Sequence, residues 1–251
     1  VAGDLTMTGQ QLKPMGPLDF EELIDVYKEQ IRYITEAGAD LLVVETMMSL
    51  QESRAALIAA KETCPDIPVM VTMTFESDGR SLFGTDAATA AIVLSSLGAD
   101  AVGANCSTGP DQMAEVIRRM AKVTDIPIIA KPNAGLPSLD EKGQTVYDMG
   151  PEEFGADMEL LLDAGAQILG GCCGTTPEHI RKMTHRLAGR PVPVHGNQTQ
   201  RALTSERASL TFDLDGPFLI VGERINPTGK KKLQQELREG SFELVTQFAQ
   251  E

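Results

Sequence analysis

Apolar and polar positions form two kinds of segment along most of the chain. Longer segments carry apolar residues three or four positions apart, which is the spacing of one helix face, and shorter ones are unbroken apolar runs typical of buried parallel strands. The segment from Phe20 to Ala37 is the clearest helix, with acidic residues in its first turn and Gly38 after its end. We expect helices over 20–37, 50–63, 86–97, 111–123, 151–164 and 177–187. We expect strands over 1–3, 41–44, 69–75, 101–104, 128–131 and 168–170.

A short phrase recurs at three junctions where a helix gives way to a strand. It is Ala-Gly-Ala-Asp at 37–40, Leu-Gly-Ala-Asp at 97–100 and Ala-Gly-Ala-Gln at 164–167. The glycine is expected to end the helix in a left-handed conformation. Such repetition is typical of tandem βα units, and two α/β folds fit six strands: a doubly wound sheet, or a TIM (β/α)8 barrel that lacks its first two strands. Asp40 and Asp100 lie at strand starts in both folds, where we expect structural roles.

The pattern changes after Leu187. Residues 189–217 contain Arg-Pro-Val-Pro-Val, Asn-Gln-Thr-Gln and Gly-Pro without a helical period, which predicts a linker. Residues 218–221 predict a new strand, followed by a turn-rich segment and a helix to the end. One strand and one helix bury too little surface to fold alone. We therefore expect a first domain over 1–188, a linker over 189–217 and the start of a second domain over 218–251. A chain that begins with Val1 in place of Met is interpreted as part of a longer protein.

Composition excludes several classes of function. Among 251 residues, 22 are Lys or Arg and 36 are Asp or Glu, so the net charge of −14 disfavours binding to nucleic acid. There is no apolar run near the roughly 18 residues that a membrane span needs, and no signal peptide is recognisable. The four cysteines are too few for a secreted disulfide scaffold. We expect free or metal-bound thiols in a reducing compartment, the cytoplasm.

Three of the four cysteines directly follow predicted strands. Cys106 lies in Gly-Ala-Asn-Cys-Ser after the strand at 101–104, and Cys172 and Cys173 lie in Gly-Gly-Cys-Cys-Gly-Thr-Thr-Pro after the strand at 168–170. The carboxyl ends of parallel strands meet at one edge, so these thiols are expected to converge, whereas Cys64 belongs to the opposite edge. A buried thiol that acts only as a small apolar side chain is the alternative for each. Soft thiolates favour zinc, and three ligands leave one position open for a further thiolate, which suits thiol alkylation.

The pair of motifs Gly-Ala-Asn-Cys and Gly-Gly-Cys-Cys-Gly-Thr resembles the homocysteine S-methyltransferase family. Lys-Pro-Asn-Ala-Gly-Leu-Pro at 131–137 and Val-Glu-Thr at 44–46 resemble further loops of that family, and residues 222–231 resemble the start of a pterin-binding folate domain. The resemblance implies a homocysteine-binding TIM barrel over 1–188 and the first βα unit of a second barrel over 218–251. It implies a methyltransferase that methylates the thiolate of L-homocysteine to methionine. It further implies methylcobalamin as the immediate donor and methyltetrahydrofolate as the methyl source.

The resemblance also assigns roles to single residues. The residues that match the family's zinc ligands are Cys106, Cys172 and Cys173. Glu45 matches a carboxylate that holds the amino group of homocysteine, with a solvated rim acid as the alternative. Asn105 is expected to orient substrate or thiolate, or to form a turn. Asn226 is expected to contact the pterin, or to mark a plain Asn-Pro turn.

Several features leave alternatives open. The family's first strand carries an Asp-Gly loop that completes the homocysteine pocket, and nothing in this chain matches it, so activity is assigned to the parent protein. The expected partners are L-homocysteine and the cobalamin- and folate-binding domains of that parent chain. The rival functions are a homocysteine methyltransferase that uses betaine or S-methylmethionine, and a non-catalytic zinc or thiol protein. His179 is expected to lie on the surface or to pack against a helix. Lys230, Lys231 and Lys232 are expected to form a solvated face, with a contact to folate carboxylates as the alternative.

Overall fold

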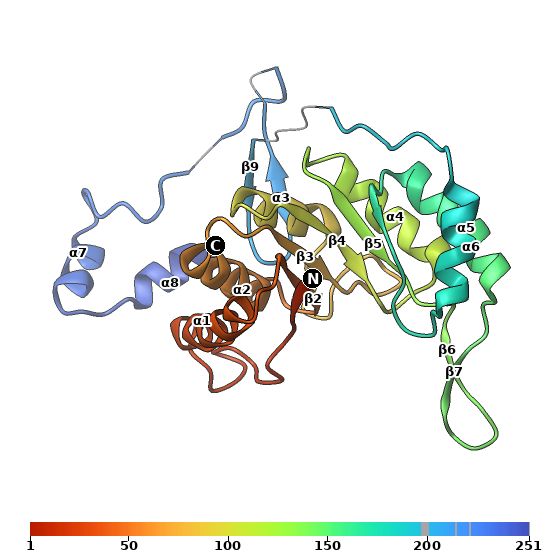
Figure 1. Cartoon of the computed structure of the whole chain (residues 1–251). Coiled ribbons are helices and arrows are strands. Elements are labelled where there is room, and N and C mark those ends of the chain that lie inside the picture. Colours follow the sequence, from red (N-terminus) through yellow and green to blue (C-terminus); the bar gives the residue numbers. More distant parts are fainter. Residues whose placement is uncertain (197–200, 214, 221, 251) are drawn as a thin grey trace. The chain divides into compact units, whose positions relative to one another are not determined.

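The largest sheet is parallel and its strands follow one another in chain order (Figure 1). A computed structural model describes residues 1–196, 201–213, 215–220 and 222–250. The paired order is β1-β2-β3-β4-β5-β8. The strands are β1 (Ala2–Leu5), β2 (Leu41–Met47), β3 (Val69–Met73), β4 (Ala101–Asn105), β5 (Ile128–Lys131) and β8 (Ile168–Leu169). A doubly wound sheet reverses its order at a switch point, whereas this order runs in one direction, so the doubly wound alternative is wrong.

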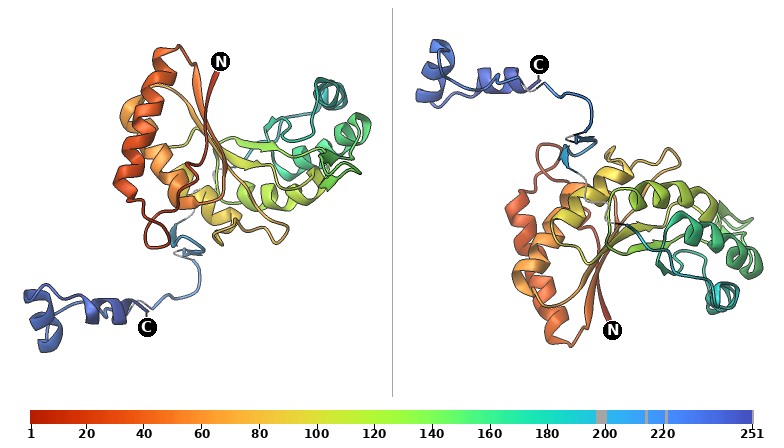
Figure 2. Two further views of the ribbon diagram at one scale, coloured as in Figure 1. Left: turned by 90° about the horizontal axis from the view of Figure 1, so that it is seen from below. Right: turned by 90° about the horizontal axis from the view of Figure 1, so that it is seen from above.

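Six helices form a single layer against this sheet. Each helix packs against the next in the chain, which places them on one face, and the two views in Figure 2 show them along the outer side of the sheet. These helices are α1 (Phe20–Glu36), α2 (Leu50–Thr63), α3 (Ala87–Ser96), α4 (Pro110–Ala121), α5 (Pro151–Ala164) and α6 (Pro177–Leu187). A parallel α/β sheet in sequential order with its helices on one face is the arrangement of consecutive βα units in a barrel.

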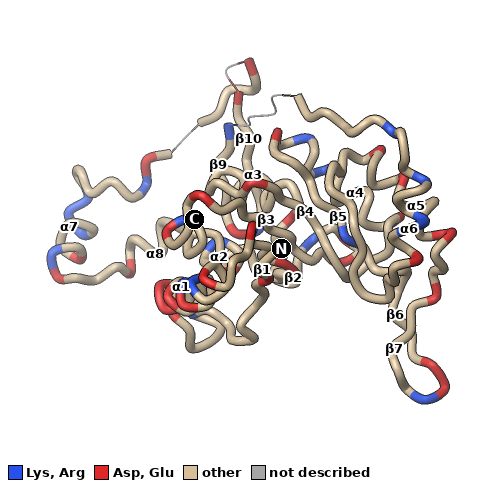
Figure 3. Tube along the Cα trace, in the orientation of Figure 1, with Lys and Arg blue, Asp and Glu red and all other residues tan. Residues whose placement is uncertain are grey.

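The helix boundaries follow from local sequence chemistry. In α1 the residues buried on the sheet side are Leu23, Ile24, Tyr27 and Ile31. The solvent side of α1 is strongly acidic, as the red segments of Figure 3 show. The glycines of the three repeated phrases have φ angles of 89°, 92° and 116°, at Gly38, Gly98 and Gly165. This left-handed conformation is what the repeated phrase predicted, because a residue without Cβ adopts it at little cost.

The central strands are buried on both faces. Every residue of β4 is buried, and β3 has one half-buried residue among five. This explains why these strands appear in the sequence as unbroken apolar runs. At the amino edge, Asp100 accepts hydrogen bonds from the Val69 N–H and from Lys61, both at 2.8 Å. Its role is structural, as predicted.

Two short hairpins were not predicted. β6 (Pro137–Leu139) pairs with β7 (Thr145–Tyr147) between β5 and α5, and β9 (Ala202–Thr204) pairs with β10 (Ser209–Thr211) within the segment predicted as a linker. Strands of three residues are too short to show a period in the sequence. The second hairpin is fixed to the first unit because the hydroxyl of Thr85 donates to the carbonyl of Glu206 at 2.7 Å.

The described chain divides into two units, Val1–Thr211 and Phe212–Glu251. The strand predicted at 218–221 is wrong for residues 218–220, which form no strand, and Val221 lies outside the described residues. A strand needs a neighbour to satisfy its backbone groups, and the described part of this unit offers none. The predicted final helix is divided into α7 (Lys231–Arg238) and α8 (Glu243–Gln250), with Gly240 between them at φ 75°. No helix among the described residues is long and apolar enough to cross a membrane.

Candidate functional site

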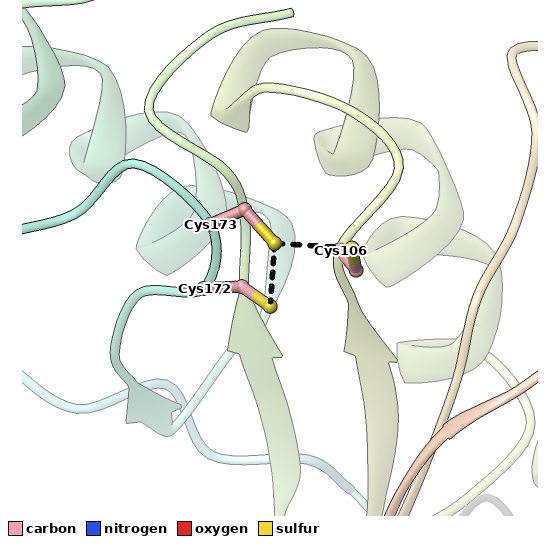
Figure 4. Close-up of side chains that lie close together, drawn as sticks. All are labelled: Cys106, Cys172 and Cys173. Atoms are coloured by element: carbon pink, nitrogen blue, oxygen red, sulfur yellow. Dashed lines mark hydrogen bonds between the residues drawn. The ribbon is translucent and has the colours of Figure 1, made fainter. Parts of the chain in front are cut away.

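Three thiols from two distant parts of the chain meet at the carboxyl edge of the sheet (Figure 4). The Sγ atom of Cys173 lies 3.8 Å from that of Cys106 and 3.9 Å from that of Cys172. All three sulfur atoms lie within 4.8 Å of one another, and they form the one candidate metal-binding cluster among the described residues. Cys64 lies at the end of α2, where its thiol contacts the carbonyl of Ala60 at 3.3 Å. The topology therefore brings together the cysteines that the strand positions predicted.

The spacing of these sulfurs fits a tetrahedral metal ion. A zinc–sulfur bond of about 2.3 Å gives sulfur atoms about 3.8 Å apart along a tetrahedral edge. The two closest pairs in the cluster have this separation. Cys106 and Cys172 are half-buried and Cys173 is exposed, so the cluster opens to solvent on one side. The three residues could hold a soft metal ion and leave one coordination position accessible.

The backbone around Cys106 is held in an uncommon conformation. Cys106 and Ser107 have φ angles of 64° and 62°. The N–H of Cys106 donates to the carbonyl of Lys131 at 3.0 Å, and the N–H of Thr108 donates to the carbonyl of Cys106 at 2.8 Å. Positive φ at non-glycine residues costs free energy and often marks functional positions. These bonds turn the chain sharply at the end of β4 and direct the thiol toward the loop after β8.

The loop that carries Cys172 and Cys173 is fixed by the loop after β5. The N–H of Cys172 donates to the carbonyl of Pro132 at 2.8 Å, and the N–H of Ala134 donates to the carbonyl of Cys173 at 2.9 Å. The side chain of Asn133, which is 2% exposed, accepts from the N–H of Cys173 at 3.1 Å. Asn133 lies in the Lys-Pro-Asn-Ala-Gly motif but was not singled out from the sequence. This explains how that motif serves the cysteine loop.

The hydrogen bond between two of the thiols makes them unequal acids. A hydrogen bond from Cys172, opposed by burial, lowers the pKa of Cys106 to about 7. The same hydrogen bond, together with burial, raises the pKa of the Cys172 thiol above its usual range. Of these two thiols, Cys106 is therefore the stronger acid.

Asn105 connects three strands to the cysteine cluster. Its side chain is fully buried, and its Oδ1 accepts from the N–H of Thr46 at 2.9 Å and from the hydroxyl of Thr72 at 2.7 Å. Its Nδ2 donates to Oγ1 of Thr46 at 2.8 Å and lies 3.8 Å from Sγ of Cys172. Thr46 has a φ of 60°, which is rare for a β-branched residue, and the two bonds from Asn105 hold it there. Asn105 is therefore a buried bridge rather than a turn residue.

Glu45 lies at the end of β2 on the side of the cysteine cluster. Its carboxylate forms an ion pair with the ammonium of Lys131, the last residue of β5. The two side chains are 26% and 20% exposed, so the pair is largely withdrawn from solvent. Burial lowers the pKa of Lys131, against the charges of Cys172 and Asp4, which raise it. Sequence reasoning missed Lys131, although its place at a strand end beside the cysteines was a usable signal.

The β6–β7 hairpin places an aromatic residue next to the thiols. The ring of Tyr147 lies against the backbone of Gly174, where an added Cβ would come within 2.5 Å of the ring. Burial, a hydrogen bond with Cys173 and the charges of the thiols raise the pKa of Tyr147 to about 12. Tyr147 therefore lies close enough to the thiols to interact with them electrostatically. No signal in the sequence pointed to Tyr147, because the hairpin itself was not predicted.

The remaining candidates lie outside the cluster. Asn226 belongs to the second unit, where its side chain accepts from the N–H of Thr228 at 2.9 Å and donates to Glu223. His179 is 6% exposed and its ring contacts Thr176 at 2.8 Å and the carbonyl of Met149 at 3.0 Å. His179 therefore packs within the fold, which is one of the two structural roles expected for it.

Comparisons with known proteins agree with this architecture. The family model described as homocysteine S-methyltransferase matches residues 1–187. Proteins named methionine synthase from Mycobacterium tuberculosis and Mycobacterium leprae are 32% identical over 234 and 239 residues, which cover 91% of this chain and 20% of each relative. The chain thus spans about a fifth of the length of these relatives.

Solved structures show the same fold. The homocysteine methyltransferase MmuM from Escherichia coli in its apo form has a TM-score of 0.59 at 22% identity, covering 74% of this chain and 62% of that one. The metallated form of MmuM has a TM-score of 0.56 at 22% identity, covering 68% of this chain and 53% of that one.

Proposed function

The chain belongs to the homocysteine S-methyltransferase family, and from this we propose that its parent protein methylates the sulfur of L-homocysteine to give methionine. The single observation that carries the proposal is the cluster of three thiols at the carboxyl edge of the sheet, with sulfur separations of 3.8 Å and 3.9 Å. In parallel α/β folds this edge is where substrates bind. Thiol ligands with one accessible position suit a substrate that itself carries a thiol.

We propose that the cluster holds zinc through three ligands: Cys106, Cys172 and Cys173. When bound, zinc would lower the pKa of the homocysteine thiol so that its sulfur is ionised near neutral pH. The protein's own residues prepare this site. Asn105 fixes Thr46 and faces Cys172, and Asn133 fixes the backbone of Cys173.

Substrate positioning falls to the end of β2 in this proposal. The acidic residue near the end of β2 is Glu45. Its ion pair with Lys131 places its carboxylate on the same side of the sheet as the cysteine cluster. A carboxylate at this place would bind the substrate ammonium, while the bonds from Asn105 to Thr46 hold the adjoining backbone. The substrate thiol would release its proton to solvent on binding. Its sulfur would then form the new bond to the methyl carbon while the bond from that carbon to its donor breaks and the electron pair stays with the donor.

We infer the methyl donor from the extent of the match to the relatives. The match to methionine synthases extends over 234 residues, more than the 187 residues of the family match, and so includes part of the segment that follows. This favours methylcobalamin as donor and methyltetrahydrofolate as methyl source, over betaine or S-methylmethionine. We propose a barrel over 1–188 completed by further strands of the parent, a linker over 189–217, and a pterin-binding domain that starts at 218–251 and includes Asn226. Cobalamin would bind to other domains of the parent, which we place in the cytoplasm.

The metal proposal is tested by measuring zinc binding to single cysteine variants. Cys106→Ala and Cys173→Ala are expected to abolish stoichiometric zinc binding, because two remaining thiols cannot form the site. Cys64→Ala is the matched control and should bind zinc like the wild type. Equal zinc content in all variants would contradict the assignment of the ligands.

The donor proposal is tested on the parent protein with three donors in parallel. Methionine should form from homocysteine with methylcobalamin, and not with betaine or S-methylmethionine. If betaine or S-methylmethionine supports methylation, the proposed donor is wrong, but the proposed thiol site stands. Zinc binding without any methyl transfer would support the non-catalytic rival.

A further inference from the structure

We propose that Lys131 is the second half of the amino-acid site: it holds Glu45 before substrate binds and then takes the α-carboxylate of the incoming homocysteine. This inference rests on the proposed function and extends it to a residue that selects the substrate. Its basis is the position and surroundings of one half-buried ion pair.

The pair crosses the inner side of the sheet. Glu45 lies two residues before the end of β2 and Lys131 ends β5, and β3 and β4 lie between them. Neighbouring strands are about 4.8 Å apart, so three steps in a flat sheet would span about 14 Å. Long side chains that extend over the concave side of the sheet cover this span, and the Glu45–Lys131 pair therefore lies over the ends of the central strands. Cys106 follows β4 directly, so the pair lies beside the thiol cluster.

The stem of Lys131 has a defined path. A Cβ added to Gly170 would meet Cγ of Lys131 at 3.4 Å and Cδ at 3.7 Å, so the stem runs along the glycine that precedes the cysteine pair. The ammonium group also interacts electrostatically with Cys172 and Asp4. The lysine is thus directed to the cluster rather than to solvent, and only 20% of its side chain is exposed.

An ion pair withdrawn from solvent restricts what can bind beside it. If a cation alone displaced Lys131 from Glu45, the lysine would be left buried without its partner, which is costly. If an anion alone displaced Glu45, the carboxylate would be left in the same state. A zwitterion avoids both costs because its ammonium pairs with Glu45 while its carboxylate pairs with Lys131. The exchange replaces one ion pair with two and leaves no charge uncompensated.

The geometry of an α-amino acid fits this exchange. Its ammonium and carboxylate are bonded to the same carbon, so its two counter-groups must lie side by side, as Glu45 and Lys131 do. The side chain of the amino acid is then free to extend from the pair toward the thiol cluster. A thiol that lacks either charged group would leave one member of the pair unmatched. The pair therefore selects thiols that are also α-amino acids.

Three thiols distinguish the two halves of the site. L-homocysteine carries both charged groups, 3-amino-1-propanethiol lacks the carboxylate, and 4-mercaptobutanoate lacks the ammonium. Their dissociation constants are measured by calorimetry on the zinc-loaded chain and on two variants, Lys131→Met and Glu45→Gln. Lys28→Met is the matched control, because Lys28 also forms an ion pair, at 2.6 Å with Glu62, and is 25% exposed.

Lys131→Met is expected to weaken binding of homocysteine and of 4-mercaptobutanoate at least about tenfold, the usual effect of losing a charged hydrogen bond. Binding of 3-amino-1-propanethiol should be unchanged or tighter, because the Lys131 ammonium no longer competes with the ligand's ammonium for Glu45. Glu45→Gln should instead weaken the binding of the two thiols that carry an ammonium group, homocysteine and 3-amino-1-propanethiol. The ratios between thiols within one variant do not depend on how much of that variant is folded.

Two other results would overturn the inference. If Lys131→Met changes the affinity of all three thiols equally, or of none, Lys131 does not contact the carboxylate, although the proposed function survives. If the zinc-loaded wild type binds none of the three thiols, the proposed function fails and this inference fails with it. Lys28→Met should match the wild type for every thiol.

Discussion

Replacing Asn105 with alanine tests whether one buried amide organises the site. The substitution removes the acceptor for the Thr46 N–H and the Thr72 hydroxyl, at 2.9 Å and 2.7 Å. It also removes the donor to Oγ1 of Thr46 at 2.8 Å and the amide facing Cys172. Because neither the N–H nor the hydroxyl of Thr46 is then held by Asn105, we expect the backbone of Thr46 to move away from its φ of 60°.

The loss in free energy of unfolding depends on how deeply each group that loses its partner is buried. Thr72 is fully buried, so its hydroxyl loses its partner at a cost of about 1–3 kcal/mol. Thr46 is half-buried and water replaces part of its two bonds, each worth about 0.5–1.5 kcal/mol. Relaxation of the strained Thr46 backbone returns about 1 kcal/mol. We therefore expect Asn105→Ala to lower the free energy of unfolding by about 3 kcal/mol.

Urea unfolding followed by tyrosine fluorescence measures this change. The chain has no Trp, and all three Tyr residues lie within Val1–Thr211, so the signal reports on the first unit. The matched control is Thr72→Val, which keeps the shape but removes only one of the three bonds and should cost about 1 kcal/mol. In the zinc-loaded protein, Asn105→Ala should keep the metal stoichiometry and weaken zinc affinity about 10- to 100-fold, since the ligands remain but their support is lost.

Two results would refute this reasoning. If Asn105→Ala costs no more than Thr72→Val, the amide does not act as a three-strand bridge. If zinc affinity is unchanged in Asn105→Ala, the contact with Cys172 does not orient the ligand.

Three further changes have defined outcomes. Tyr147→Phe should weaken zinc binding about tenfold without changing the urea midpoint, because it removes only the hydroxyl beside Cys173; unchanged affinity would assign the ring a packing role alone. Gly174→Ala should cost more stability than Gly143→Ala, since both glycines have positive φ but only the first would place a Cβ 2.5 Å from the Tyr147 ring; equal losses would show that this contact is loose. Burial raises the pKa of Glu52, so the folded state keeps this proton where the unfolded chain has lost it, and stability falls as pH rises through that interval. The stability gained by Glu52→Gln, measured by urea unfolding, should therefore grow as pH rises above the ordinary carboxyl pKa of about 4.5. A difference that does not change with pH would argue against a carboxyl whose charged form is disfavoured by burial.

The cysteine cluster could be predicted from sequence because topology alone brings it together. In a parallel sheet every strand ends at the same edge, so residues that directly follow strands converge whatever their separation in the chain. Cys106 and Cys173 are 67 residues apart and meet at 3.8 Å for this reason. Glu45 was singled out through the family resemblance and not by this logic. Helix boundaries were equally accessible, since their glycine endings and apolar spacing are local signals.

Other parts of the site depend on contacts that leave no local pattern. Tyr147 reaches Gly174 only because a hairpin of two three-residue strands forms, and strands that short have no readable period. The strand pattern could have placed Lys131 at the same edge, but its pairing with Glu45 across two strands depends on side-chain reach and burial. The strand expected at 218–221 shows the opposite error. Its apolar run was read as a strand although nothing in the described second unit pairs with it.

The central claim is that the three thiols hold a zinc ion whose open position takes the thiol of the substrate. Zinc K-edge X-ray absorption on the full-length parent, with and without L-homocysteine, measures this directly. We expect three sulfur neighbours and one lighter neighbour, changing to four sulfur neighbours when homocysteine is added. A zinc shell of four ligands that homocysteine does not alter, or the absence of bound zinc, would contradict the claim.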